Sequence, residues 1–288
     1  AHKKNSGLAH VIAASEEEAF EDIRDLTALF ANQGFMNPDV DDVDLAQFVP
    51  PSKVRTYEVH PLVDAILDKD AEHIELLSMW APNMTTIVGR LGGATVGVLA
   101  NNPAHLAGVL DAAAGEKAAR FVRTCDAFGI PLIVIADVQG FLPGAGQEWE
   151  GAVRRGAKLL HAFGEAVVPR VTLITRRAYG GAYVAMNSKS LGATRVFAWP
   201  DAEVSVMGAV AAVRVLHRRI LADIPVEQRE AMELELAAEH EKVSGGVAKA
   251  IEIGAVDEMI TPAQTRSALA KSIANAPHRR GSHGNIPL

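Results

Sequence analysis

The strongest constraint on the fold is an apolar, strand-like run that leads into a glycine turn and a short helical segment. The run covers residues 171–175, the turn is Tyr-Gly-Gly-Ala at 179–182, and the helical segment extends to about Ser188. Two glycines permit a tight bend and a close approach of a ligand to the backbone. The first N–H groups of the helix have no partner within it and can face a negative charge. The segment therefore predicts an anion-binding elbow built from backbone.

A second unit of the same kind precedes the elbow. Residues 131–138 (PLIVIADV) form a continuous apolar run, which is typical of a strand buried on both faces. A glycine loop at 139–144 and a helix at 151–166 follow it and lead to the strand at 170–175. Strands joined by crossover helices pair in parallel, with right-handed connections. The repetition predicts an α/β fold around a parallel sheet.

The remaining segments predict further elements around this sheet. Ser15 begins a capping box for a helix over residues 16–32, and the acidic, proline-rich stretch 36–52 is typical of an exposed linker. β-rich runs at 86–90 and 95–100 are joined by Gly92-Gly93 and predict a hairpin. The other predicted elements are helices at 61–67, 116–128, 211–221, 226–243, 247–253 and 262–273, a strand or turn at 74–80 and a short strand at 254–260.

Composition excludes several classes of protein. The 288 residues suffice for one large domain or two modest ones, and a chain that is 49% hydrophobic but 5% aromatic must build its core from Ala, Val, Leu and Ile. A net charge of −7 argues against binding to nucleic acid or to an anionic membrane. The single cysteine, Cys125, excludes an intrachain disulfide framework. With no long apolar run and no signal segment, we expect a soluble protein of the cytoplasm.

We expect no metal site. The acid cluster Asp39, Asp41, Asp42 and Asp44 lacks the glycine and the distal glutamate of a calcium loop, so we interpret it as part of the solvated linker. The ten histidines show no spacing with acids that is typical of metal ligands.

Several long blocks resemble, in one order, the carboxyltransferase β subunit of biotin-dependent acyl-CoA carboxylases. The blocks are the elbow within VRRGAKLLHAFGEAVVPRVTLITRRAYGGAYVAMNSKSL, the preceding EKAARFVRTCDAFGIPLIVIADVQGFLPG, the following FAWPDAEVSVMGA and the opening AHKKNSGLAH. The resemblance covers essentially the whole chain. It is greatest to the actinobacterial acetyl/propionyl-CoA type.

The resemblance implies a crotonase-like (ββα) superhelix. Subunits of that family contain two such domains. By this comparison residues 1–52 are the end of an N-terminal carboxyltransferase domain plus a linker, and residues 53–288 are the C-terminal domain. The chain then corresponds to a C-terminal half, whose N-terminal counterpart comes from the same or another chain. The family also implies a biotinylated α subunit as partner and a homo-oligomer, a hexamer of two stacked trimers.

The implied activity is transfer of a carboxyl group from carboxybiotin to acetyl-CoA or propionyl-CoA, which gives malonyl-CoA or methylmalonyl-CoA for lipid synthesis. Negative charge develops on oxygens in this reaction, so the site needs fixed N–H donors, each contributing on the order of 3 kcal/mol. The resemblance assigns the stabilisation of the biotin ureido oxygen to the backbone N–H groups of Gly181 and Ala182. It assigns biotin binding to four further residues: Gly140, Phe141, Tyr179 and Gly180.

Two positions in these blocks bear on specificity and on loop geometry. Val184 matches the position that lines the acyl pocket in the family, where propionyl-preferring relatives often have aspartate. An apolar residue there favours acetyl-CoA, and the alternative is that Val184 is an ordinary core residue of its helix. Gln139 replaces a proline that is usual in the glycine loop, which removes a restriction on φ.

Several charged or reactive side chains are further candidates for a functional role, and some of them have two interpretations. Lys3 and Lys4 match a family motif for CoA binding, whereas the cations at 154, 155 and 158 either meet CoA phosphates or form an exposed helix face. Asp137 is a general base or a hydrogen-bonding support for the glycine loop. Cys125, on an apolar helix face, is expected to be inert core.

Three other functions remain open on sequence grounds. A crotonase-type hydratase or decarboxylase needs a catalytic carboxylate, and residues 179–185 contain no glutamate. A biotin-linked acyl-CoA decarboxylase would share most of the motifs. A non-catalytic assembly half would use the glycine elbow only to pack a helix on a strand.

Overall fold

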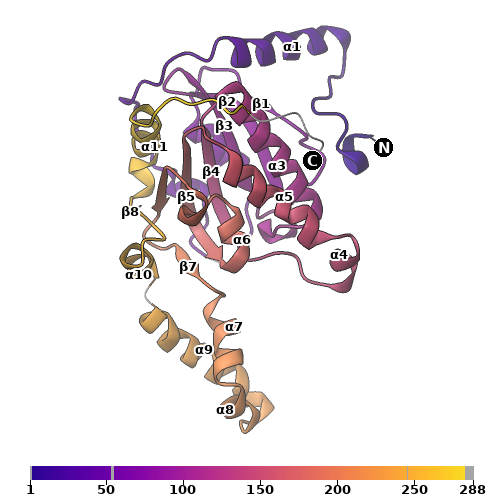
Figure 1. The fold of residues 1–288 in the computed structure, drawn as a ribbon. Helices are drawn as coiled ribbons and strands as arrows, with labels where there is room; N and C mark the ends of the chain where they lie inside the picture. Colours follow the sequence, from indigo (N-terminus) through magenta and orange to yellow (C-terminus); the bar gives the residue numbers. More distant parts are fainter. Residues whose placement is uncertain (1, 53–54, 245, 283–288) are drawn as a thin grey trace.

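The computed structural model describes residues 2–52, 55–244 and 246–282, and within them it forms one mixed sheet with helices on both faces (Figure 1). The sheet has the strand order β1-β2-β3-β4-β5-β6-β8, and β7 pairs with β5 beyond this path. β1, β2 and β3 are antiparallel, whereas the pairs β3–β4, β4–β5, β5–β6, β5–β7 and β6–β8 are parallel. The predicted α/β fold around a parallel sheet is confirmed.

The described chain contains the predicted elements with changed bounds, together with β6, β7 and α4, which were not predicted. The strands are β1 (Ile74–Glu75), β2 (Met84–Leu91), β3 (Ala94–Asn101), β4 (Leu132–Val138), β5 (Arg170–Tyr179), β6 (Arg195–Ala198), β7 (Glu203–Ser205) and β8 (Glu258–Met259). The helices are α1 (Glu16–Ala31), α2 (His60–Ile66), α3 (Ala112–Phe128), α4 (Ala145–Trp149), α5 (Ala152–Glu165), α6 (Gly180–Ala185), α7 (Ala209–Leu216), α8 (Arg218–Ala222), α9 (Val226–Ser244), α10 (Gly246–Glu252) and α11 (Thr265–Ala274).

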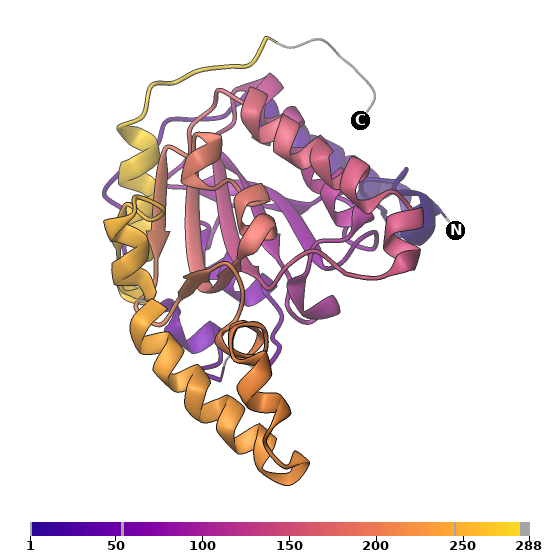
Figure 2. The same cartoon turned by 60° about the horizontal axis from the view of Figure 1, so that its bottom comes forward.

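The centre of the sheet is buried on both faces, as the apolar run at 131–138 predicts. Every residue of β4 is buried, and β5 is buried from Arg170 to Ala178. One face packs against α3, α5 and α6, and the other against α2, α11 and the short 3-10 helix Leu45–Phe48. The helices α3 and α5 lie side by side over their face in both views (Figures 1 and 2). Two hydrophobic clusters, one on each face, therefore hold the parallel strands between them.

Small residues let α3 and α5 approach closely. A Cβ built on Gly115 of α3 would lie 3.0 Å from the Cα of Gly156 in α5, so neither helix has room for a larger side chain at this crossing. Beside the crossing, Glu116 of α3 accepts from Arg155 and Lys158 of α5, each at 2.6 Å. Burial opposes the charge on Glu116, but these two cations lower its pKa. The pair Arg155 and Lys158 thus joins two helices in the described structure.

Four expectations about local structure were wrong. The stretch 36–52 is not simply exposed, because Leu45 and Val49 are buried in the core and the Asp42 carboxylate accepts from the backbone N–H and hydroxyl of Ser267 at the start of α11. β5 continues past residue 175 to Tyr179, since it gains β7 as a second partner. The helix at 211–221 is broken at His217, and only Glu258–Met259 of the stretch 254–260 pairs as a strand.

The helices α7, α8 and α9 form an arm that extends away from the sheet (Figure 2). A small cluster of Val213, Leu221 and Ala237 holds them together. None of the helices in the described parts of the chain is both long and apolar enough to cross a membrane.

One buried cation supports the turn between β1 and β2. Lys117 of α3 is 1% exposed, and its Nζ donates to the carbonyl oxygens of Leu77 (2.9 Å), Trp80 (3.0 Å) and Ala81 (3.4 Å). Leu77 and Ala81 have φ values of 59° and 47°, which side chains other than glycine rarely adopt. The ammonium therefore stabilises a turn that the local sequence disfavours. Burial lowers the pKa of Lys117 to about 8.

We expect Lys117→Met to lower the free energy of unfolding by about 2–3 kcal/mol at pH 7, because buried carbonyls lose a charged donor. Urea unfolding of both proteins measures this difference.

The difference between the two proteins should also depend on pH. Between pH 8 and the ordinary lysine pKa of 10.5, the unfolded chain holds a proton that native Lys117 has released. The stability of the wild type should therefore rise with pH across this window relative to Lys117→Met. A constant difference from pH 7 to pH 10.5 would contradict the lowered pKa.

Candidate functional site

The two predicted glycine segments meet at the carboxyl edge of the sheet. Val138 of β4 pairs with Ala178 of β5, so the glycine loop that follows one strand lies beside the elbow that follows the other. On the other side of β5, Tyr179 pairs with Ser205 of β7. Ligands of open α/β sheets bind outside the carboxyl ends of the strands. The sheet topology therefore brings three backbone segments to one candidate site.

The elbow has the geometry that its glycines predict. Gly180 has a φ of 55°, and a Cβ there would lie 2.8 Å from the carbonyl oxygen of Val206, so only glycine fits without strain. A Cβ on Gly181 would meet no atom within 4 Å. Gly181 and Ala182 lie in the first turn of α6, whose N–H groups have no carbonyl partner within the helix. Beside Gly181 the backbone is open to a ligand.

The glycine loop is held in place by a short segment that the sequence did not single out. The N–H of Leu110 donates to the carbonyl of Gly140 (3.0 Å), and the N–H of Leu142 donates to the carbonyl of Leu110 (2.7 Å). Phe141 packs its ring against the backbone of Gly156 in α5. Gly140 has a φ of 157°, and a Cβ there would meet nothing within 4 Å. These bonds anchor the loop on both sides of Phe141, although Gln139 lacks the restriction of proline.

Two tyrosines of the elbow use their hydroxyl groups to fix its position. The Tyr179 hydroxyl donates to the carboxylate of Glu203 on β7. The Tyr183 hydroxyl donates to the carbonyl of Ala255 (2.9 Å), and burial raises its pKa to about 12. Both hydroxyl groups are engaged as donors, so the elbow is tied to β7 and to the segment after α10.

The Asp137 side chain is not exposed as a general base would be, and it does not bond directly to the glycine loop. It is 1% exposed, and its two carboxylate oxygens accept from Nε of Arg176 and from Nε of Arg177, each at 2.8 Å. A carboxylate held by two guanidinium groups is a poor general base, and its side-chain bonds go to β5 rather than to the glycine loop. The two arginines were not among the predicted site residues. Their signal is a charged doublet inside an otherwise apolar strand.

The other predicted site residues are distributed as follows. Val184 is 39% exposed on α6, so the interpretation as a core residue is wrong. Lys4 is exposed on the π-helical turn His2–Ser6, and the side chain of Lys3 lies outside the described residues. Cys125 is fully buried, which raises the pKa of its thiol and confirms the prediction of inert core. Within the described residues no group of His, Cys, Asp or Glu could hold a metal ion.

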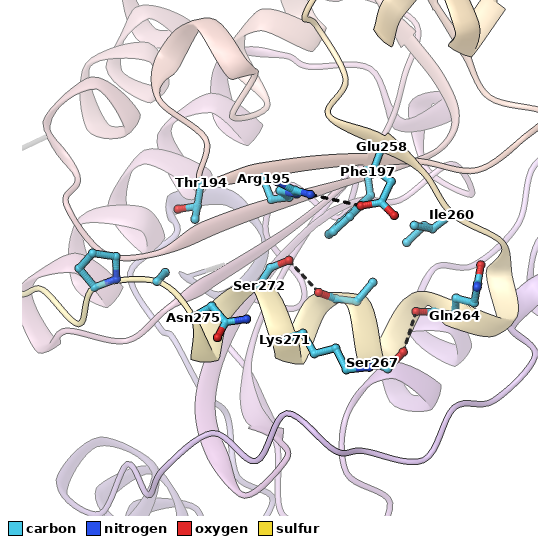
Figure 3. A pocket seen from close by; sticks show the side chains of 13 residues that line it. Thr194, Arg195, Phe197, Glu258, Ile260, Gln264, Ser267, Lys271, Ser272 and Asn275 are labelled. Atoms are coloured by element: carbon cyan, nitrogen blue, oxygen red, sulfur yellow. Dashed lines mark hydrogen bonds and ion pairs between the residues drawn. The ribbon is translucent and has the colours of Figure 1, made fainter.

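A cavity of about 600 Å³ lies away from the elbow, between α11 and the strands β6 and β8 (Figure 3). Two of its lining side chains, Arg195 and Glu258, pair at 3.3 Å, and Ser272 donates to the backbone carbonyl of Ala268. No residue of the elbow or of the glycine loop lines this cavity.

Comparison with known proteins agrees with this geometry. The family model of the carboxyl transferase domain matches residues 1–283. The chain belongs to the carboxyl transferase domain family. The resemblance noted from the sequence blocks is confirmed.

Curated relatives from this family match the chain along its whole length. It is 58% identical over 290 residues to the biotin-dependent acetyl-/propionyl-coenzyme A carboxylase beta6 subunit of Mycobacterium tuberculosis H37Rv, covering 100% of this chain and 61% of the relative. It is 49% identical over 293 residues to the propionyl-CoA carboxylase beta chain of Rhodococcus erythropolis, with the same coverage. The carboxyl transferase chain thus spans less than two thirds of the length of these relatives.

Solved structures confirm the crotonase-like α/β fold. The hexameric transcarboxylase 12S, crystallised with methylmalonyl-coenzyme A and methylmalonic acid bound, matches with a TM-score of 0.89 at 37% identity, covering 100% of this chain and 57% of that one. A single-chain long-chain acyl-CoA carboxylase matches with a TM-score of 0.82 at 28% identity, covering 94% of this chain and 26% of that one.

The two elbow glycines should respond differently to alanine. Gly180→Ala forces a Cβ into a left-handed conformation and against the Val206 carbonyl, so we expect a loss of about 1–2 kcal/mol or more in stability. Gly181→Ala adds its methyl group in open space within a helix and should be neutral or slightly stabilising. Thermal unfolding compares the two variants, and equal effects would contradict the distinct surroundings of the two glycines.

Proposed function

We propose that this chain is the carboxyltransferase component of an acyl-CoA carboxylase, which moves a carboxyl group from carboxybiotin to acetyl-CoA or propionyl-CoA. The observation that carries the proposal is the pair of N–H groups at Gly181 and Ala182 in the first turn of α6, with open space beside Gly181 at the sheet edge. The 58% identity to a subunit named for this activity supports it. The products would be malonyl-CoA or methylmalonyl-CoA.

The residues present fit a biotin group. A Cβ at Gly181 or Gly140 would fill space that is empty in the protein, so both segments offer bare backbone to a flat ligand. Gly140, Phe141, Tyr179 and Gly180 would hold the ring system. When bound, the cofactor supplies the carboxyl group that is transferred and the ureido oxygen that becomes negatively charged.

The protein's part in the reaction is electrostatic. The N–H groups of Gly181 and Ala182 donate to the charge that develops on an oxygen, and they need no reorganisation because α6 already orients them. The Glu203 carboxylate accepts from the Tyr179 hydroxyl, and the Asp137 carboxylate accepts from two arginines. Both carboxylates near the elbow are therefore already engaged. Backbone donors, beside carboxylates that are already engaged, favour carboxyl transfer over the hydratase alternative.

The substrate proposal depends on Val184. Its side chain is 39% exposed on the elbow helix, where it is available to line an acyl pocket. An apolar residue there supports acetyl-CoA, and the names of the relatives include both acetyl and propionyl substrates. Lys3 and Lys4 are our proposed contacts for the CoA portion.

The proposal extends to assembly. We propose that residues 1–52 complete an N-terminal carboxyltransferase domain and that residues 53–288 form the C-terminal domain, with the N-terminal half supplied by the same or another chain. A biotinylated α subunit would deliver the carboxyl group in the cytoplasm. The hexamer of transcarboxylase 12S supports a hexamer here.

The first test is the reverse reaction, carboxyl transfer from malonyl-CoA to free biotin, in the complete carboxylase. Gly181→Pro removes one N–H donor, and we expect kcat to fall about 100-fold or more. Gly181→Ala is the matched control, because both variants place a Cβ in the space beside the turn but only alanine keeps the N–H; the alanine variant should retain more activity than the proline variant. Equal activity in the two variants would contradict the donor role of this N–H.

A competition assay between the two acyl-CoA substrates tests Val184. We expect Val184→Asp to shift the ratio of kcat/KM for propionyl-CoA over acetyl-CoA by about tenfold toward propionyl-CoA, since one methylene in a pocket accounts for a factor of this size. An unchanged ratio with normal turnover would remove Val184 from the acyl pocket.

A further inference from the structure

The register between β4 and β5 changes just before the site. The two strands pair residue by residue up to Ala136 opposite Ile174, and the next pair is Val138 opposite Ala178. β4 advances two residues where β5 advances four. The extra length on β5 forms a bulge at residues 175–177, and bulges of this kind re-aim the chain that follows them.

A single carboxylate faces this bulge. Asp137 is the residue of β4 between the two pairs, and its oxygens Oδ2 and Oδ1 accept from Nε of Arg176 and Nε of Arg177, both at 2.8 Å. Adjacent residues of a regular strand point to opposite faces. Both guanidinium groups reach one carboxylate here because the strand is bulged. All three side chains are buried, so the charges depend on one another.

The cluster also connects to segments outside the two strands. The Nη1 atom of Arg176 donates to the carbonyls of Ser52 (3.0 Å) and Arg55 (2.9 Å), and its guanidinium lies 4.7 Å from the centre of the Tyr57 ring. The backbone N–H of Asp137 donates to Oδ1 of Asn101 at the end of β3 (3.3 Å). Arg176 of the bulge is therefore bonded to the segment that precedes α2, and Asp137, which faces the bulge, is bonded through its backbone to β3.

The position of the cluster in the chain gives it a consequence for the site. Asp137 is two residues before Gln139 and the glycine loop, and Arg177 is two residues before Tyr179 and the elbow. Without the bulge, regular pairing would place the elbow about 7 Å further along β5 relative to the glycine loop, at roughly 3.3 Å per residue. Groups that bind one ligand together tolerate far smaller displacements.

We propose that Asp137 is a positioning residue of the carboxyl-transfer site, which holds the β5 bulge through Arg176 and Arg177 and so keeps the elbow in step with the glycine loop. This inference rests on the proposed function. It assigns the cluster to the biotin side of the site, since both segments that it aligns are the proposed biotin contacts.

The test uses reverse transfer from malonyl-CoA to free biotin in the complete carboxylase, with each substrate varied in turn. We expect Asp137→Asn, which keeps the size of the side chain but removes its charge, to raise the KM for free biotin at least tenfold. The KM for malonyl-CoA should rise less than the KM for biotin, because Val184 is its one proposed contact on the two displaced segments. A residue that only stabilised the fold would not separate the two constants in this way.

Arg177→Lys provides a milder variant, which keeps the buried positive charge but does not place a planar Nε donor at Oδ1. We expect a threefold or larger rise in the KM for biotin, and this variant decides the question if Asp137→Asn does not fold. Glu258→Gln is the matched control: it breaks the exposed ion pair with Arg195 on another part of the sheet and should change neither constant.

Two outcomes have different meanings. If the wild type transfers carboxyl groups but the folded variants keep the biotin KM within twofold, or change both constants equally, the positioning role is wrong and the proposed function stands. If the wild type shows no transfer from malonyl-CoA to biotin, the proposed function fails and the positioning role fails with it.

Discussion

The parallel pairing of β4 with β5 is the interaction on which the rest of the structure depends. Both strands are buried by helices on two faces, so their position is set by hydrophobic contact from both sides. Because the strands run in the same direction, the segments that follow them emerge at one edge of the sheet. The glycine loop and the elbow are neighbours for this reason, although about forty residues separate them in the chain, roughly the length expected of a crossover unit.

The site differs from one built on reactive side chains. The donors that we propose are backbone N–H groups of α6, and the charged and phenolic side chains around them are engaged in hydrogen bonds and ion pairs. Glycine serves two separate purposes here. At Gly180 the chain needs a left-handed conformation close to Val206, whereas at Gly181 the missing side chain leaves space for a ligand. A fixed backbone is well suited to stabilise charge that appears only during a reaction.

Most elements could be predicted from local patterns. The hairpin at Gly92-Gly93, the capped helix after Ser15 and the buried strand at 131–138 all appear with small changes in their bounds. Two of the errors came from contacts between distant segments. Leu45 is buried because α11 and α2 pack beside it, and β5 is longer than its apolar run because β7 pairs with its last residues.

The sequence by itself determined the α/β class, the elbow with Gly180 and Gly181, and the family to which these blocks belong. These follow from short-range pattern and from blocks long enough to be specific. Only the tertiary structure decided that Leu110 anchors the glycine loop and that Asp137 binds Arg176 and Arg177. The preferences of residues for helix or strand do not predict that a carboxylate on one strand will contact two guanidinium groups on the next. Such contacts exist only after the sheet has formed. Burial in the sheet removes these charges from water, and each buried charge then needs a partner of opposite sign.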